Sequence, residues 1–141
     1  MDIVLYNTLP DQAADIRQTV FVCEQGFQEE FDGIDCTASH LLLFLDGQAV
    51  ATCRFFPNGA DRYLVGRIAV LAPYRGRGLG AQLLARAEQE IARQGGQTVC
   101  LHAQQDKAPF YEKQGYAAYG PVEYEENYPH IWMMKTLHKT A

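Results

Sequence analysis

Apolar residues follow two spacings along the chain, one typical of helices and the other typical of strands. Two segments carry apolar residues every three or four positions, which predicts an amphipathic helix in each. The residues on these stripes are Ala13, Ile16, Val20 and Cys23 in the first segment and Leu83, Leu84, Ala87 and Ile91 in the second. Shorter β-prone runs predict strands at residues 3–6, 40–45, 49–56, 63–71, 99–103, 116–119 and 131–137.

Cap and turn residues predict where these elements end. Thr8 is expected to cap the first helix, with Pro10 in its first turn. Asp106 is expected to cap a short third helix. The pair Asp46-Gly47 predicts a two-residue hairpin. Glycines predict the helix ends, at Gly26, Gly95-Gly96 and Gly115.

The predicted order is β-α-β-β-β-α-β-α-β-β. The helix at residues 79–94 lies between the long strand at 63–71 and the next strand, which predicts a parallel crossover there. The other neighbouring strands are expected to pair antiparallel. We therefore expect a mixed α/β (α+β) fold, in which helices flank a largely antiparallel central sheet with one parallel strand pair.

Two acidic stretches separate the predicted elements and are expected to be loops. Residues 27–37 contain Glu29, Glu30, Asp32 and Asp35, with room for one helical turn. Residues 120–130 contain Glu123, Glu125 and Glu126. Either stretch can be plain solvated surface, or it can attract a cationic ligand.

Composition narrows the class of protein. A length of 141 residues predicts one domain, residues 1–141, and 48% hydrophobic with 21% charged residues is ordinary for a globular protein. The net charge of −5 disfavours a nucleic-acid partner. No apolar run reaches the ~20 residues that span a bilayer, and the first residues do not resemble a signal peptide. We expect a cytoplasmic protein without a membrane partner. The four cysteines and four histidines show no zinc spacing, so no metal is expected.

The segment Arg75-Gly76-Arg77-Gly78-Leu79-Gly80 stands between the longest strand and the second helix. Glycines let a ligand approach backbone N–H groups, and the first turn of a helix leaves such groups without partners. With the helix dipole and two arginines, these groups predict a cradle for pyrophosphate.

Other interpretations of this loop fit less well. Gly76-x-Gly78-x-x-Ala81 also matches a dinucleotide fingerprint, but residues 72–75 separate it from the strand and no acid stands at the end of the next strand. A Walker loop is excluded because no Gly-Lys-Ser/Thr occurs. A plain strand-to-helix turn with surface arginines is the remaining alternative.

Two motifs, Arg75-x-x-Gly78-x-Gly80 and residues 101–116, resemble the GNAT superfamily of acetyl-CoA-dependent N-acetyltransferases. Arg75-x-x-Gly78-x-Gly80 is similar to that family's Gln/Arg-x-x-Gly-x-Gly/Ala signature. Residues 101–116, LHAQQDKAPFYEKQGY, resemble its strand-then-helix segment that ends in Phe-Tyr-Glu-Lys-x-Gly-Phe/Tyr. The family often has Asn at the position of Gln104 and a small Ala at the position of Lys107, so this chain departs from it there.

The resemblance implies acetyl-CoA as cosubstrate and a set of residues that bind it. The central strand would splay from its parallel neighbour and offer its backbone to the pantetheine arm. The loop would hold the pyrophosphate, Gln104 would donate to a pantetheine amide, and Phe110 would wall the cofactor. The implied set is Ile68, Ala69, Val70, Arg75, Gly76, Arg77, Gly78, Gly80, Ala81, Gln104 and Phe110.

The resemblance also implies the reaction, transfer of an acetyl group to a primary amine. Tyr111 matches the family position of the general acid, and a backbone N–H near Val70 would stabilise the oxyanion. The residues do not single out a base, since Glu24, His40, His102 and His130 could each serve. Glu24 and His130 are candidates for the acceptor side, where the acidic stretches favour a cationic small molecule. The chain is expected to be a monomer or homodimer. A CoA-binding sensor or interaction module without turnover is the alternative.

Overall fold

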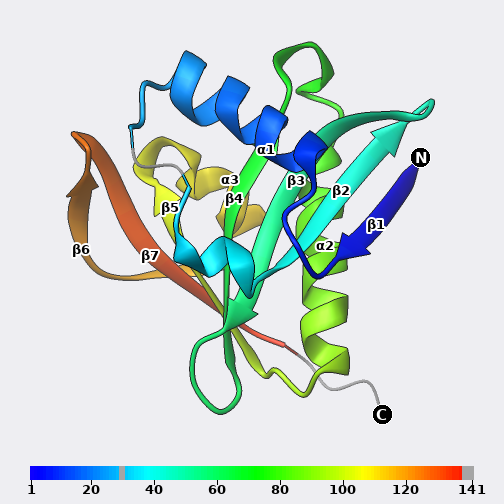
Figure 1. Ribbon diagram of the computed structural model, residues 1–141. Helices are drawn as coiled ribbons and strands as arrows, with labels where there is room; N and C mark the ends of the chain where they lie inside the picture. The colour runs from blue at the N-terminus through cyan, green and yellow to red at the C-terminus, as the bar shows by residue number, and fades with distance from the viewer. Residues whose placement is uncertain (29–30, 138–141) are drawn as a thin grey trace. The chain divides into compact units, whose positions relative to one another are not determined.

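The computed structural model describes residues 1–28 and 31–137, so Glu29, Glu30 and His138 lie outside the described residues. The chain divides into two compact units, which are described separately. Unit 1 comprises Met1–Phe56 and Val65–Ala87, and unit 2 comprises Pro57–Leu64 and the residues from Glu88 onward. The element order agrees with the predicted order (Figure 1).

In unit 1, β1 (Asp2–Tyr6) pairs antiparallel with β2 (Ser39–Leu45), which pairs antiparallel with β3 (Gln48–Pro57). Asp46 and Gly47 both have positive φ, 50° and 79°, as a type I′ hairpin requires. β4 (Arg62–Val70) is the next strand in the sheet, and its residues 65–70 belong to this unit. Three leucines in the middle of β2 are fully buried, so β2 lies at the centre of the core.

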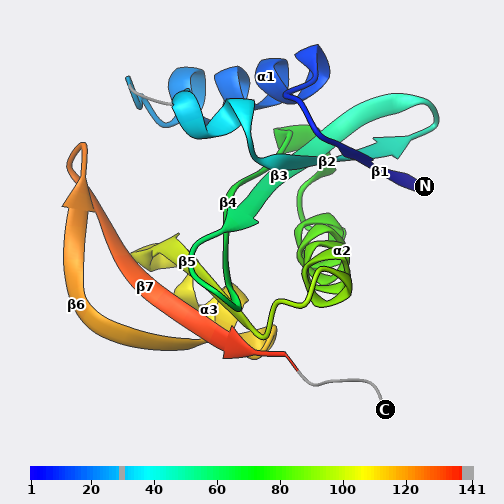
Figure 2. The same ribbon diagram turned by 60° about the horizontal axis from the view of Figure 1, so that its bottom comes forward.

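α1 (Asp11–Arg17) begins later than the sequence predicts. Pro10 is the N-cap, and its carbonyl accepts from the N–H groups of Ala13 and Ala14 at 3.0 and 3.1 Å. The predicted Thr8 cap is therefore wrong. Pro10 has the extended backbone of an N-cap, and no side chain caps this end. Figure 2 shows α1 on one face of β1 to β3 and the start of α2 on the other.

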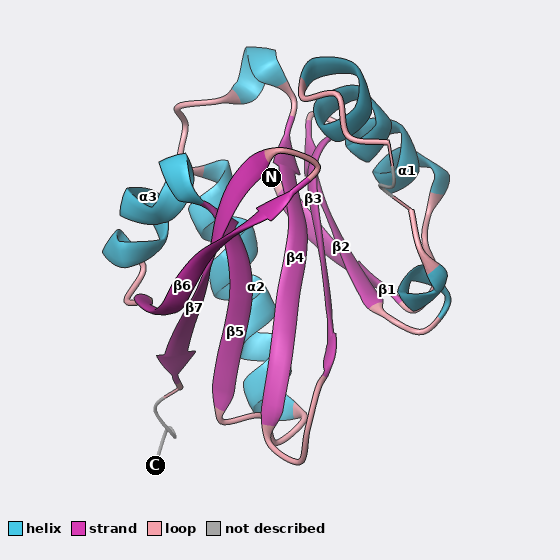
Figure 3. Ribbon diagram, turned by 90° about the vertical axis from the view of Figure 1, so that its left-hand side faces the viewer, coloured by secondary structure: helices cyan, strands magenta, loops and turns pink. Residues whose placement is uncertain are grey.

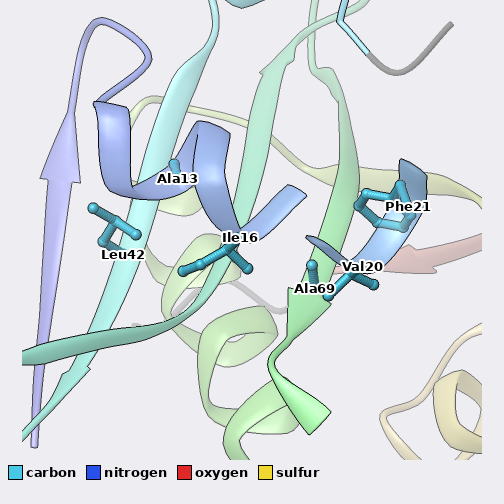
Figure 4. Close-up of a cluster of buried hydrophobic side chains, with 6 residues drawn as sticks. All are labelled: Ala13, Ile16, Val20, Phe21, Leu42 and Ala69. Atoms are coloured by element: carbon cyan, nitrogen blue, oxygen red, sulfur yellow. The ribbon is translucent and has the colours of Figure 1, made fainter. Parts of the chain in front are cut away.

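A π-helix, Gln18–Glu24, continues α1 and rotates the buried face. Ala13, Ile16 and Val20 are buried as predicted, and Phe21 joins them against Leu42 and Ala69 (Figure 4). Cys23, predicted to lie on the same stripe, is exposed. The wider π turn changes the residue spacing from 3.6, so the stripe predicted from a regular helix ends early. Gly26, with φ of 79°, stops the helix as predicted.

Within the first acidic stretch, Gly33–Cys36 forms a 3-10 helix, the one helical turn for which the sequence left room. Asp35 is buried there, and its carboxylate accepts from Arg17 at 2.8 and 3.1 Å and from Arg54 at 2.9 Å. Asp32 accepts from Arg54 at 2.7 and 3.1 Å. We refer to Arg17, Asp32, Asp35 and Arg54 as the arginine–aspartate network.

α2 (Leu79–Arg93) carries the predicted apolar stripe. Leu83, Leu84, Ala87 and Ile91 are each at most 1% exposed. A 3-10 turn, Ala72–Tyr74, connects β4 to the glycine loop that precedes this helix. At the other end the chain leaves the helix through Gly95, whose φ of 92° suits a glycine.

In unit 2, residues 62–64 of β4 pair parallel with β5 (Thr98–Gln104), as the crossover rule predicts. β5 pairs antiparallel with β7 (Tyr128–Thr136), and β7 with β6 (Ala117–Glu125), so β6 is the outer strand (Figure 3). The fold class is therefore confirmed as a mixed α/β fold with one parallel strand pair.

Two sequence predictions for unit 2 are wrong. The expected loop at residues 120–130 is a hairpin, in which β6 and β7 extend to a turn with positive φ at Glu126 and Asn127. Asp106 does not cap the third helix, because a 3-10 turn, Gln105–Lys107, leads directly into α3 (Ala108–Lys113) and makes Lys107 the N-cap. Gly115 ends α3 as predicted, with φ of 96°. None of the helices in the described part of the chain is long and apolar enough to cross a membrane.

Candidate active site

The glycine loop in unit 1 has the backbone that an anion cradle needs. Gly76 and Gly78 have φ of 79° and 76°, in the left-handed region that disfavours other residues. A Cβ built on either one would meet nothing within 4 Å, so the space beside the loop is open. Leu79, Gly80 and Ala81 form the first turn of the 15-residue helix α2, where N–H groups lack intrahelical partners. This arrangement can bind a phosphate through backbone donors.

Arg75, the first residue of the loop motif, has its guanidinium engaged within unit 1. Its Nε donates to the Val70 carbonyl at 2.8 Å, and a terminal nitrogen donates to Glu24 Oε2 at 2.6 Å. The structure thus brings together two predicted site residues, Arg75 and Glu24, as an ion pair. A phosphate contact by Arg75 would require exchange of Glu24 for the phosphate. Arg77 is exposed and lies over the Tyr74 ring at 5.5 Å.

The end of β4 leads into this loop and carries an irregular backbone. Arg67 has φ of 53°, which a regular strand does not contain and which costs about 1–3 kcal/mol at a residue other than glycine. Its guanidinium lies 3.6 Å from Asp32. Ile68, Ala69 and Val70 follow directly, with Ala69 buried in the core and the other two half-buried. The irregularity stands next to the three residues predicted to offer their backbone to the cosubstrate.

Tyr111 lies on α3 in unit 2, half-buried beside Phe110 and Tyr116. The ring of Tyr111 makes edge contacts with Phe110 at 5.0 Å and with Tyr116 at 6.2 Å between centroids. The hydroxyl of Tyr116 donates to Glu88 at 2.9 Å, and burial together with that carboxylate raises the pKa of Tyr116 well above its usual range. A phenol with a raised pKa and an engaged hydroxyl is a poor general acid, so Tyr116 does not replace Tyr111 as the predicted one.

Gln104, the last residue of β5, shares a face of the unit 2 sheet with three aromatic side chains. Residues two apart on a strand point to the same face, so His102 lies on the face of Gln104. The register places His130 opposite Gln104 and Trp132 opposite His102. The predicted residues Gln104 and His130 are therefore neighbours on one sheet face.

A cluster of ionisable side chains occupies this face. Glu125, from the end of β6, lies 3.3 Å from His102 Nδ1 through one oxygen and 3.3 Å from His130 Nε2 through the other. The His102 ring stacks on Trp132 at 4.5 Å and lies 5.0 Å from the His130 ring. We refer to His102, Glu125, His130 and Trp132 as the histidine–glutamate cluster. No group of three or more His, Cys, Asp or Glu residues suited to a metal occurs among the residues that the structure describes.

His40, another candidate base, has a different environment. Its ring is buried in unit 1 and Nε2 lies 3.1 Å from the Asp35 carbonyl, which can only accept, so this nitrogen carries a proton. Burial lowers the pKa of His40, an effect that the neighbouring Asp35 opposes. His40 therefore supports the arginine–aspartate network.

Sequence reasoning missed Glu125 and Trp132 as members of a cluster. Glu125 stood in a stretch predicted to be a loop, and no sequence spacing connects it to His102 or His130. The β6–β7 hairpin places Glu125 at the end of β6, 3.3 Å from each of the two rings. The alternation of side chains typical of a strand continues past Gly120 and could have predicted the hairpin. The acidic composition of the stretch favoured a loop instead.

Comparison with known proteins agrees with this architecture. The model of the family described as Acetyltransferase (GNAT) domain matches residues 7–137. The uncharacterized protein YyaT of Bacillus subtilis is 34% identical over 131 residues, which cover 89% of this chain and 88% of YyaT. The uncharacterized N-acetyltransferase YjcF of the same organism is 32% identical over 130 residues, covering 85% and 87%.

Solved structures show the same fold. The crystal structure of an acyl-CoA N-acyltransferase from Pseudomonas aeruginosa matches with a TM-score of 0.85 at 31% identity, covering 95% of this chain and 98% of that one. The fold, the glycine loop at the start of α2 and the family match agree with one another. The chain belongs to the GNAT family of acetyltransferases.

Proposed function

We propose that this protein transfers the acetyl group of acetyl-CoA to a primary amine of a small molecule. The observation that carries the proposal is the loop of residues 75–81, in which two left-handed glycines leave open space at the N-terminus of a long helix. Pyrophosphate is the anion that this loop suits, because several backbone donors converge where the helix dipole is positive. Gly76, Gly78, Gly80 and Ala81 supply the donors, and Arg77 supplies nearby positive charge.

The same proposal assigns the remaining cofactor contacts. Ile68, Ala69 and Val70 offer backbone groups to the pantetheine arm, Gln104 offers its amide, and Phe110 packs against the cofactor. Arg75 reaches the pyrophosphate when it leaves Glu24. No metal takes part, since a thioester is already activated for attack by an amine.

Tyr111 is proposed as the acid that protonates the departing thiolate. The phenol and the thiol both ionise in the alkaline range, so the proton can be shared in the transition state. Replacement by Phe keeps the ring contacts with Phe110 and Tyr116. We expect Tyr111→Phe to lower kcat by about 10²–10⁴-fold with little change in CoA affinity. A kcat within about threefold of wild type would assign the protonation to water.

The acceptor is proposed to be cationic. Glu123, Glu125 and Glu126 form an exposed acidic tip on the β6–β7 hairpin. Asp32 and Asp35 give no such support, because arginines engage both carboxylates. At low salt, spermidine should therefore have a higher kcat/KM than a primary amine that carries no further charged group. The difference should shrink as added salt screens the electrostatic attraction. A higher kcat/KM at low salt for an amine without a further charged group than for spermidine would contradict the choice of a cationic acceptor.

The loop assignment can be tested with a charge that favours the helix but opposes the ligand. Ala81→Glu places a carboxylate in the first turn of α2, where it suits the helix dipole. It should keep the melting temperature while it weakens CoA binding by about 10–100-fold, or about 1.4–2.8 kcal/mol. Ala85→Glu, exposed about one turn later, is the matched control and should bind CoA nearly as wild type.

Calorimetry with CoA on both variants decides the assignment. Equal CoA affinity in Ala81→Glu and Ala85→Glu would place the pyrophosphate elsewhere. Valine at Gly78 is a poorer test, because φ of 76° strains any residue with a Cβ whether or not a ligand binds. Thiol release from acetyl-CoA across a panel of amines then tests turnover.

A further inference from the structure

One nitrogen of the His102 ring lacks a partner although the rest of the ring is firmly held. Nδ1 faces Glu125 at 3.3 Å, and the ring stacks on Trp132. Nε2 is buried and has no hydrogen-bond partner. Buried polar atoms of folded proteins are nearly always paired, so this atom needs an explanation.

The neighbouring groups determine where the protons lie in this cluster. The Tyr128 carbonyl can only accept, so His130 Nδ1 carries a proton and donates to it at 2.9 Å. The Glu125 carboxylate, 3.3 Å from His102 Nδ1, favours the tautomer with its proton on that nitrogen. A neutral His102 ring then has its lone pair on Nε2. In this tautomer the unpartnered buried atom is a proton acceptor.

The position of His102 suits a role beside the proposed cosubstrate. His102 and Gln104 lie on the same face of β5, and Gln104 is the residue proposed to hold the pantetheine amide. Among the described residues, the ionisable groups that contact His102 are Glu125 from β6 and His130 from β7.

We propose that His102 is the general base of the acetyl transfer and that Glu125 and His130 are positioning residues. The inference rests on the proposed function. The amine nitrogen forms a bond to the acetyl carbon and passes its proton to His102 Nε2, directly or through one water. The bond from carbon to sulfur breaks, and the thiolate takes a proton from Tyr111. His102 then releases its proton to solvent, from which Tyr111 is reprotonated.

The other candidate bases are occupied in the structure. Glu24 accepts from Arg75 at 2.6 Å, and His40 Nε2 donates to the Asp35 carbonyl. His130 has its Nδ1 on a carbonyl and its Nε2 against Glu125. Of the three histidines that the structure describes, His102 is the one with a buried ring nitrogen that has no hydrogen-bond partner.

The first test replaces the base while it keeps a polar side chain of similar size. His102→Gln should lower kcat by about 10²–10⁴-fold at saturating amine and remove the acidic limb of the kcat–pH profile that the base contributes. CoA affinity, measured by calorimetry, should stay within about threefold of wild type. That split separates a catalytic role from a packing role.

A second variant and a spectroscopic measurement keep the test valid even where His102→Gln folds poorly. Glu125→Gln leaves a side chain that is 53% exposed in wild type and should fold. Glu125→Gln should lower kcat at least about tenfold and change the acidic limb of the kcat–pH profile. Glu112 is an exposed carboxylate on α3, and the control variant Glu112→Gln should change neither quantity. In wild type, nitrogen-15 correlation spectra of the imidazole rings should show His102 with its proton on Nδ1.

The outcomes separate this inference from the proposed function. If His102→Gln or Glu125→Gln keeps the kcat and the kcat–pH profile of the wild type, the inference is overturned but the proposed function is not. A proton on Nε2 of neutral His102 would have the same consequence. Absence of turnover in a wild-type protein that binds CoA would overturn the proposed function and this inference with it. If the wild-type protein turns over and both variants lose the acidic limb of the kcat–pH profile, the proposed function and the inference are both supported.

Discussion

The arginine–aspartate network of unit 1 and the histidine–glutamate cluster of unit 2 are both groups of ionisable side chains, but their geometry differs. In the network, hydrogen bonds of 2.7–3.1 Å connect Asp32 and Asp35 to Arg17 and Arg54. In the cluster, the contacts to Glu125 are 3.3 Å long and Glu125 is 53% exposed. A buried ring nitrogen, His102 Nε2, has no hydrogen-bond partner there.

The difference indicates two uses of charge. Short, bidentate pairing to arginine stabilises a folded arrangement but leaves little capacity to bind anything else. Arg54 Nε is also buried without a partner, but an arginine nitrogen is a donor and cannot accept a proton. The contacts of His102 are longer, and its Nε2 makes no hydrogen bond. We therefore propose that the network serves stability and the cluster serves chemistry.

The largest effect on stability is expected from Asp35→Asn. This substitution leaves the buried guanidinium groups of Arg17 and Arg54 without the charge that compensates them. Breaking a buried pair in this way typically costs about 3–5 kcal/mol. Urea denaturation at pH 7 measures the change in the free energy of unfolding. A loss below about 1 kcal/mol would mean that the network is not what stabilises this part of unit 1.

An intermediate effect is expected from acid. Burial would raise the pKa of Asp35, but hydrogen bonds and charge from Arg17, with further bonds from Asp32 and Arg54, lower it from 3.8 to about 2. The folded form therefore holds the carboxylate ionised more strongly than the unfolded form. This contribution is complete above about pH 5 and is lost as the pH falls toward 2; the difference in pKa corresponds to roughly 2 kcal/mol.

Denaturation at pH 7, 4 and 2 measures the acid effect, with Asp35→Asn as the control. Wild type should lose more stability than the variant between pH 4 and pH 2, because the variant has no carboxyl to protonate at this position. A parallel decline of both proteins would assign the acid sensitivity to other groups, Asp32 among them, since the hydrogen bond from Arg54 also lowers the pKa of Asp32.

The smallest effect on stability is expected from Glu125→Gln. An exposed carboxylate with 3.3 Å contacts contributes about 0–1 kcal/mol. The same substitution should nevertheless reduce kcat, which is the opposite of the pattern expected for a network residue. A loss of more than about 2 kcal/mol in urea denaturation would show that the cluster is also structural and would remove the contrast between the two regions.

The sequence predicts the regular parts of this fold because local signals determine them. The stripe from Leu83 to Ile91 is buried as its spacing indicates, and Asp46-Gly47 makes the hairpin that its residue types favour. The π-helix at Gln18–Glu24 was not predictable in the same way, because no Gly or Pro marks the point where the helical period changes. The rotation of that helix exposes Cys23 and buries Phe21.

The two parts of the candidate site likewise differ in whether local sequence signals predict them. The loop from Arg75 to Ala81 is contiguous in the sequence, so its residue types alone indicate an anion cradle. The histidine–glutamate cluster depends on strand register, which places Glu125, His102 and His130 together from three different strands. The pairing of Asp35 with Arg17 and Arg54 spans 18 and 19 residues and likewise depends on tertiary structure.

The most direct test of the account is to identify the product of the reaction. Wild-type protein is incubated with acetyl-CoA and spermidine, and mass spectrometry quantifies free CoA and N-acetylated amine. The proposed acetyl transfer predicts equal amounts of the two products, formed over many turnovers and abolished together when the amine is omitted. Tight binding of CoA with no acetylated amine from spermidine or from any other primary amine would contradict it and would favour a CoA-binding sensor.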